Sequence, residues 1–103
     1  KNIIETMSSN IFFIKVINSK PIFATPKISK FGIDGIMKNQ IIKHLRKNKY
    51  KIIEKDISIR DLKNYQISFK VNSIQGLVFI DQIENNKFSH DQIIYNILKK
   101  FIY

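Results

Sequence analysis

The chain has 103 residues, enough for one small domain with a modest core, and its 44% hydrophobic content argues against a disordered protein. The absence of cysteine excludes disulfides and thiolate metal sites, and we expect a reducing, cytoplasmic setting. No apolar run is long enough to cross a membrane, because Lys15, Asn18 and Lys20 interrupt the longest one.

The net charge of +10 invites a comparison with nucleic-acid-binding proteins. The lysines are spread along the chain, however, and isoleucine, lysine and asparagine are frequent throughout. This bias is typical of drift in a genome poor in G and C rather than of a basic binding face. We therefore expect no nucleic-acid partner, and we keep a small basic nucleic-acid-binding module as an alternative.

The hydrophobic periodicity predicts an alternation of strands and helices. In chain order these are strands at 3–6, 11–18 and 21–24, a helix at 36–48, a strand at 50–57, a short helix from 58, strands at 66–72 and 76–83, and a final helix from 89. The mixture indicates an α+β or mixed α/β domain in which helices cover a largely antiparallel sheet.

Polar residues at the helix starts predict three caps. Asp34 precedes the helix at 36–48, whose apolar stripe is Ile36, Met37, Ile41, Ile42 and Leu45, with Lys38 expected mostly outside it. Ser58 and Asp61 form an approximate capping box for the short helix. Ser89 and Gln92 have the same spacing at the start of the final helix.

A phosphate-binding element is predicted where a strand ends at Thr25-Pro26 and, after a loop, Gly35-Ile36-Met37 opens a helix. The first backbone N–H groups of a helix have no partner within the helix, so those of Ile36 and Met37 are suited to hold an anion. Taken alone, the same residues are also an ordinary helix entry.

Four other polar residues are candidates for the same site. Glu5 could pair with a protonated ring nitrogen, and Asn10 could orient that carboxylate or brace the following turn. Asn72 and Ser73 end a strand and offer an amide and a hydroxyl to a phosphate or a substrate carboxylate. Viewed singly, an acid at a strand edge faces solvent, and the other three residues form turns.

The two histidines do not indicate a metal or an acid–base site. His44 lies near the polar border of the helix at 36–48, and His90 falls in the first turn of the final helix. Because neither has an evident partner, we expect both at the surface, and we assign no metal-binding residue.

Together these segments resemble the C-terminal part of fold-type IV pyridoxal-phosphate enzymes, the group of branched-chain and D-amino-acid aminotransferases and 4-amino-4-deoxychorismate lyases. The shared pattern of an acid, Asn-hydrophobic-Phe, Thr-Pro and Gly-Ile with an arginine reads here as Glu5, Asn10-Ile11-Phe12, Thr25-Pro26 and Gly35-Ile36-Met37-Lys38. Lys38 thus replaces the usual arginine. The resemblance implies pyridoxal 5′-phosphate as cofactor.

By this resemblance Glu5 holds the pyridine nitrogen, the N–H groups of Ile36 and Met37 bind the phosphate, and Asn72 and Ser73 close the site. Gly-Ile-Met is most similar to the lyases, which split 4-amino-4-deoxychorismate into 4-aminobenzoate and pyruvate in folate biosynthesis. A branched-chain or D-amino-acid aminotransferase is the alternative within the group.

The resemblance also implies that residues 1–103 are a portion of a C-terminal cofactor-binding domain in a homodimeric enzyme. The lysine that forms the Schiff base is expected before Glu5, and no lysine of this chain occupies that place. We therefore expect the N-terminal domain and that lysine outside this chain, and we assign no catalytic residue within it.

Overall fold

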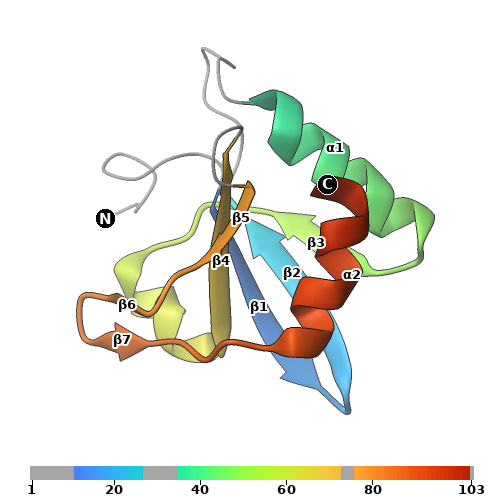
Figure 1. The fold of residues 1–103 in the computed structure, drawn as a ribbon. Helices are drawn as coiled ribbons and strands as arrows, with labels where there is room; N and C mark the ends of the chain where they lie inside the picture. Colours follow the sequence, from blue (N-terminus) through green and yellow to red (C-terminus); the bar gives the residue numbers. More distant parts are fainter. Residues whose placement is uncertain (1–10, 27–34, 73–75, 103) are drawn as a thin grey trace.

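The computed structural model describes residues 11–26, 35–72 and 76–102, which form one large sheet, two α-helices and a small hairpin (Figure 1). The elements are β1 (Ile11–Ile17), β2 (Lys20–Thr25), α1 (Gly35–Lys47), β3 (Lys51–Glu54), the 3₁₀ helix η2 (Ile59–Asn64), β4 (Ile67–Asn72), β5 (Gly76–Phe79), β6 (Gln82–Ile83), β7 (Asn86–Lys87) and α2 (Gln92–Ile102). The expected mixture of helices and strands is confirmed. Neither α-helix, as far as the described ranges extend, has the length and apolar character to span a bilayer.

The large sheet has the strand order β3-β2-β1-β4-β5, and β6 pairs with β7 in the separate hairpin. β1 runs antiparallel to both β2 and β4, and β4 runs antiparallel to β5. β2 and β3 run parallel, and α1 supplies the crossover that a parallel pair requires. The prediction of a largely antiparallel sheet is therefore confirmed.

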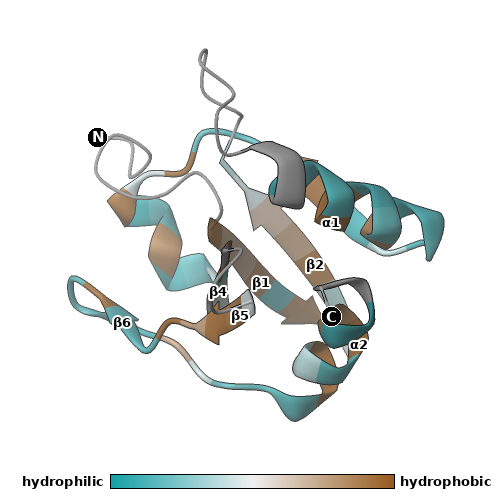
Figure 2. Cartoon of the chain, turned by 45° about the horizontal axis from the view of Figure 1, so that its top comes forward, coloured by the Kyte–Doolittle hydropathy of each residue, from teal (hydrophilic) through white to brown (hydrophobic). Residues whose placement is uncertain are grey.

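The sheet is buried on both faces, and neighbouring residues of β1 belong to opposite faces because strand side chains alternate. Figure 2 shows α1 and α2 on the same side of β1 and β2. The side packed against α1 and α2, here called the helix face, contains Phe12, Ile14, Phe23, Ile41, Ile42, Leu45, Ile52, Ile67, Phe69, Val71, Leu77, Ile94 and Leu98. The other side, here called the second face, contains Ile11, Phe13, Ala24, Ile57, Leu62, Tyr65 and Phe88.

Two predicted strands are shorter in the structure because their partner strands end. The expected strand at 76–83 divides into β5 and β6. β5 runs antiparallel to β4, and Ile80 N donates to the carbonyl of Ser68 at 2.9 Å, one residue from the start of β4, so the following residues have no strand to pair with there. The strand expected at 50–57 is β3, and Lys55 makes its last bond to the sheet, to the carbonyl of Thr25 at 3.0 Å. The strand expected at 3–6 lies outside the described residues.

The helix caps agree with the sequence in one case and differ in another. Ser58 N donates to the Asp61 carboxylate at 3.0 Å, which confirms the predicted box at the start of η2. The prediction for the final helix is wrong: α2 begins at Gln92, and the Asp91 carboxylate accepts from Ile93 N at 2.8 Å and Ile94 N at 3.1 Å. Ser89 instead donates its own N–H to the carbonyl of Gln66. The predicted cap Asp34 lies outside the described residues.

Candidate cofactor-binding site

One edge of the large sheet collects the segments that the sequence singled out. Ile11 at the start of β1 lies opposite Lys70, close to the end of β4, and Phe13 lies opposite Ala24, close to the end of β2. The other pairs that meet at this edge are Thr25 with Glu54 and Asn72 with Gly76. We call this the upper edge, from its place in Figure 1, and define it by Ile11, Thr25, Glu54, Asn72 and Gly76.

The start of α1 lies at the same edge. β2 leaves the sheet at Thr25, and α1 begins at Gly35 and runs back along the sheet to the start of β3, where Tyr50 N donates to the carbonyl of Leu45 at 2.9 Å. The first turn of α1 contains no acidic residue. No negative charge of this turn therefore opposes an anion, which the positive end of the helix dipole favours.

Lys38, in the first turn of α1, is a buried cation at this edge. Its side chain is 0% exposed, and its ammonium donates to the carbonyl of Pro26, directly after β2. The expectation that Lys38 lies mostly outside the apolar stripe is wrong. The sequence held the signal, because Lys38 precedes Ile41, Ile42 and Leu45 by three, four and seven residues and so shares their face of the helix.

Charges and hydrogen bonds fix the strand ends around Lys38. Burial lowers the pKa of the Lys38 amine below its ordinary value of 10.5, and the negative charge of Glu54 opposes this shift. Glu54 also faces Arg46, with 3.8 Å between Nη2 and Oε1. The buried Thr25 hydroxyl donates to the carbonyl of Ile11 at 2.8 Å and so ties the end of β2 to the start of β1.

The structure places three of the six predicted cofactor-binding residues. Ile36 and Met37 lie in the first turn of α1, as predicted, and Asn72 is the last residue of β4. The topology thus brings the two helix residues and Asn72 to the upper edge from separate parts of the sequence. Glu5, Asn10 and Ser73 lie outside the described residues.

The expectation that His90 has no nearby partner is wrong. Its Nε2 lies 2.5 Å from the Asp81 carboxylate, and its ring stacks on Phe79 with 5.0 Å between centroids. His90 is exposed, as expected, but it precedes α2 instead of lying in its first turn. Within 11–26, 35–72 and 76–102, no group of three histidine, aspartate or glutamate side chains is placed to hold a metal ion.

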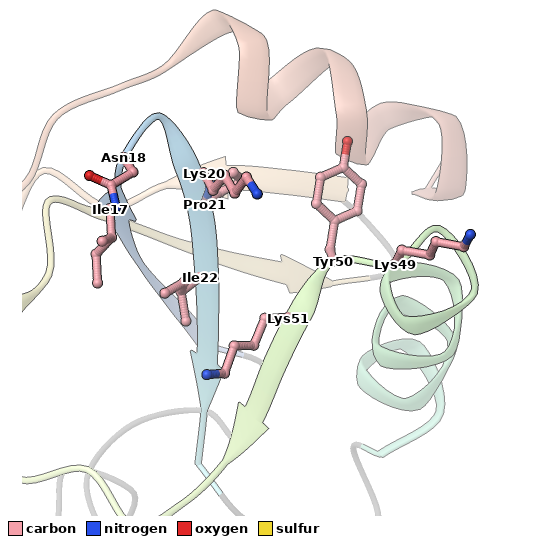
Figure 3. A pocket seen from close by; sticks show the side chains of 8 residues that line it. All are labelled: Ile17, Asn18, Lys20, Pro21, Ile22, Lys49, Tyr50 and Lys51. Atoms are coloured by element: carbon pink, nitrogen blue, oxygen red, sulfur yellow. The ribbon is translucent and has the colours of Figure 1, made fainter.

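A hollow of about 540 Å³ lies away from the upper edge, at the tip of the β1–β2 hairpin and the start of β3 (Figure 3). It is lined by Ile17, Asn18, Lys20, Pro21, Ile22, Lys49, Tyr50 and Lys51. Among its lining residues in the described part of the chain there is no predicted cofactor-binding residue. We assign the site from the strand register and the helix start, because a phosphate at a helix N-terminus is held mainly by backbone N–H groups.

Residues 1–83 match the family described as Amino-transferase class IV. The chain therefore belongs to this family. No individual curated protein sequence matches the chain.

Solved structures share the fold at low identity. A candidate 4-amino-4-deoxychorismate lyase from Legionella pneumophila has a TM-score of 0.71 and 23% identity over 88% of this chain and 33% of its own. An aminotransferase from Brucella abortus bound to pyridoxal phosphate has a TM-score of 0.67 and 21% identity over 86% of this chain and 30% of its own. A branched-chain aminotransferase from Thermoproteus uzoniensis has a TM-score of 0.70 and 21% identity over 89% of this chain and 30% of its own.

These likenesses confirm the predicted fold class, and the family agrees with the predicted cofactor. At such identities they show the fold and do not separate lyases from aminotransferases. The chain spans about a third of the length of the structures it matches.

Proposed function

We propose that this chain is the cofactor-binding portion of a fold-type IV pyridoxal-phosphate enzyme, and that the enzyme is a 4-amino-4-deoxychorismate lyase. The observation that carries the proposal is that the first turn of α1, through the bond of Lys38 to Pro26, and the end of β4 both lie at the upper edge. Family membership supports the cofactor, and the Gly35-Ile36-Met37 sequence supports the lyase.

The described residues fit the phosphate of the cofactor. The N–H groups of Ile36 and Met37 begin a helix of 13 residues, no acid in its first turn opposes an anion, and Lys38 adds a buried positive charge. Asn72 ends β4 at the same edge, and asparagine is a residue type that can donate a hydrogen bond to an anion.

In this assignment Glu5 holds the ring nitrogen of the cofactor in its protonated form, Asn10 orients that carboxylate, and Ser73 binds the phosphate with Asn72. When bound, pyridoxal phosphate supplies an electron sink for carbanion chemistry. The chain then orients the ring and its phosphate, while substrate contacts and the Schiff-base lysine come from a preceding part of a longer protein. We also propose that this protein is a cytoplasmic homodimer without a nucleic-acid or membrane partner.

The test of the lyase is product formation by a protein that carries this chain together with the preceding domain. Given pyridoxal phosphate and 4-amino-4-deoxychorismate, it should release 4-aminobenzoate and pyruvate in equal amounts. Glu5→Gln should lower kcat by about a hundredfold or more, because the ring nitrogen loses its negative partner. Lys43→Met, on the exposed side of α1, is the matched control and should leave kcat unchanged. The 103-residue chain alone should form no pyruvate. Formation of pyruvate would contradict the assignment of the Schiff-base lysine to a preceding part of the protein.

The second candidate is an aminotransferase of the same fold, supported by the likeness to the Thermoproteus and Brucella enzymes. The same protein would then consume an amino donor and 2-oxoglutarate, form glutamate, and release no pyruvate from 4-amino-4-deoxychorismate. Formation of glutamate without 4-aminobenzoate would support the aminotransferase and contradict the lyase.

A further inference from the structure

Lys38 joins two elements that the phosphate site requires. It lies one residue after Met37 in α1, and its ammonium reaches the carbonyl of Pro26 at the exit of β2. Helical side chains tilt toward the N-terminus of their helix, which directs a residue of the first turn toward the helix start. The contact therefore anchors the first turn of α1 to the upper edge.

The burial of this charge has an energetic cost. Removing an ammonium from water costs several kcal/mol unless other charges and hydrogen bonds compensate. In the described part of the chain, the acid whose charge acts on Lys38 is Glu54, which is 31% exposed and also faces Arg46. A leucine or methionine would fill the same place on the apolar stripe without this cost. The position is thus occupied by a cation where an apolar side chain would pack.

We propose that Lys38 is a positioning residue for a phosphate monoester: its bond to Pro26 holds the N–H groups of Ile36 and Met37 toward the phosphate, and its charge adds to the positive helix end. This inference rests on the proposed function. It assigns a role to a side chain that points back to the strand exit, in addition to the backbone groups already assigned.

The test compares ligands that differ only in the phosphate. Pyridoxine 5′-phosphate and pyridoxine are suitable probes, because neither forms a Schiff base and binding is then independent of the catalytic lysine. Calorimetric titration of the chain should show that Lys38→Met weakens binding of pyridoxine 5′-phosphate by about tenfold or more, with pyridoxine changed less than about twofold. Lys38→Arg should keep the affinity within about threefold, because it keeps the charge and an N–H donor. Lys43→Met, exposed on the same helix, should bind both probes like the wild type.

A merely structural role would change the two probes alike. If a folded Lys38→Met chain keeps the wild-type preference for the phosphorylated probe, the inference is overturned and the proposed phosphate site stands. If the wild-type chain shows no preference for the phosphorylated probe, the proposed site fails and the inference fails with it.

If Lys38→Met does not fold, the pH dependence of binding by Lys38→Arg tests the inference. As the pH rises toward 10.5, the wild-type preference for pyridoxine 5′-phosphate should fall before that of Lys38→Arg, because the lysine loses its charge and the arginine does not. Coinciding pH curves would overturn the inference.

Discussion

The two faces of the sheet are both buried but are covered by different kinds of structure. The helix face is closed by α1 and α2, whose apolar residues recur at helical spacing. The second face is closed by the short η2 and by the segment around Phe88, through a few separate side chains. Long periodic elements give a continuous layer, whereas short segments depend on individual contacts.

β1 offers a matched pair of residues for this comparison. Phe12 stacks on Phe69 in the helix face, with 4.9 Å between centroids and 4° between planes. Phe13 lies in the second face, where its ring centroid is 5.5 Å from that of Tyr65 and 6.0 Å from that of Phe88. Phe12 and Phe13 are both 0% exposed, so a difference between them reports what covers each face.

The largest expected effect is the loss of Phe12. Phe12→Ala should lower the free energy of unfolding by about 3–5 kcal/mol, and Phe13→Ala by about 1 kcal/mol less, because short segments can collapse further into the cavity. Urea unfolding of both variants measures the difference. Phe12→Leu and Phe13→Leu repeat the comparison if an alanine variant does not fold. Equal losses would show that the two faces are packed equally firmly, and a reversed order would show that the second face is packed more firmly.

The sequence predicted the two long helices better than the ends of the strands, for a physical reason. The stripe of Ile41, Ile42 and Leu45 and the apolar residues of α2 follow a local period, so each helix is readable from its own segment. The division of the strand at 76–83 depends on where β4 begins, and β4 lies several residues earlier in the chain. Strand ends set by a partner cannot be read from a local pattern.

The candidate site shows the same division between local and distant information. The helix start at Ile36 and Met37 and the strand end at Asn72 were readable locally and are confirmed as positions in the fold. That they lie at one edge follows from the register of β1 with β2 and β4 and from the bond of Lys38 to Pro26. The burial of Lys38 differs from the expectation because a charge normally favours solvent, whereas the position of Lys38 on the apolar stripe directs it inward.

The next largest effect is on the pH dependence of stability and concerns two buried titratable groups, Lys38 of α1 and Tyr65 of the second face. Burial lowers the pKa of Lys38, so between that lowered pKa and 10.5 the unfolded chain holds more protons and stability rises with pH. Burial, with a smaller effect of Asp61, raises the pKa of Tyr65, so stability falls as the pH rises above 10.0.

Lys38→Met separates these opposite trends. It should leave stability near neutral pH unchanged or raise it by about 1–2 kcal/mol, because an apolar side chain replaces a buried charge and Glu54 retains Arg46. The alkaline rise should vanish in the variant, while the fall assigned to Tyr65 remains. Thermal unfolding between neutral pH and pH 10.5 measures both. A variant with the wild-type rise would show that Lys38 is not its source.

A smaller effect is expected from two buried hydroxyls that flank β1. Thr25 Oγ1 donates to the carbonyl of Ile11 at 2.8 Å, and Ser68 Oγ donates to the carbonyl of Phe12 at 3.0 Å. Thr25→Val and Ser68→Ala should each cost about 1 kcal/mol, the usual net value of such a bond. Chemical unfolding of the single and double variants tests this, with near-additive losses expected. Losses well below this value would indicate that the carbonyls are satisfied without the hydroxyls.

The smallest effect lies at the start of η2, which covers the second face through Leu62. The pKa of Asp61 is lowered, first by the hydrogen bond from the Ser58 backbone and then by the Ser58 side chain. The Asp61 carboxylate therefore contributes to stability above pH 3.8, and this contribution is lost as the pH falls through the lowered pKa. Asp61→Asn should therefore cost about 0.5 kcal/mol near neutral pH and nothing in strong acid, where the wild-type carboxyl is protonated. Because η2 is short, this loss should loosen Leu62 against Phe13 and its neighbours while the helix face keeps its protection, which amide hydrogen exchange can measure residue by residue. Equal loss of protection in both faces would mean that the sheet and all its covering segments unfold as one unit.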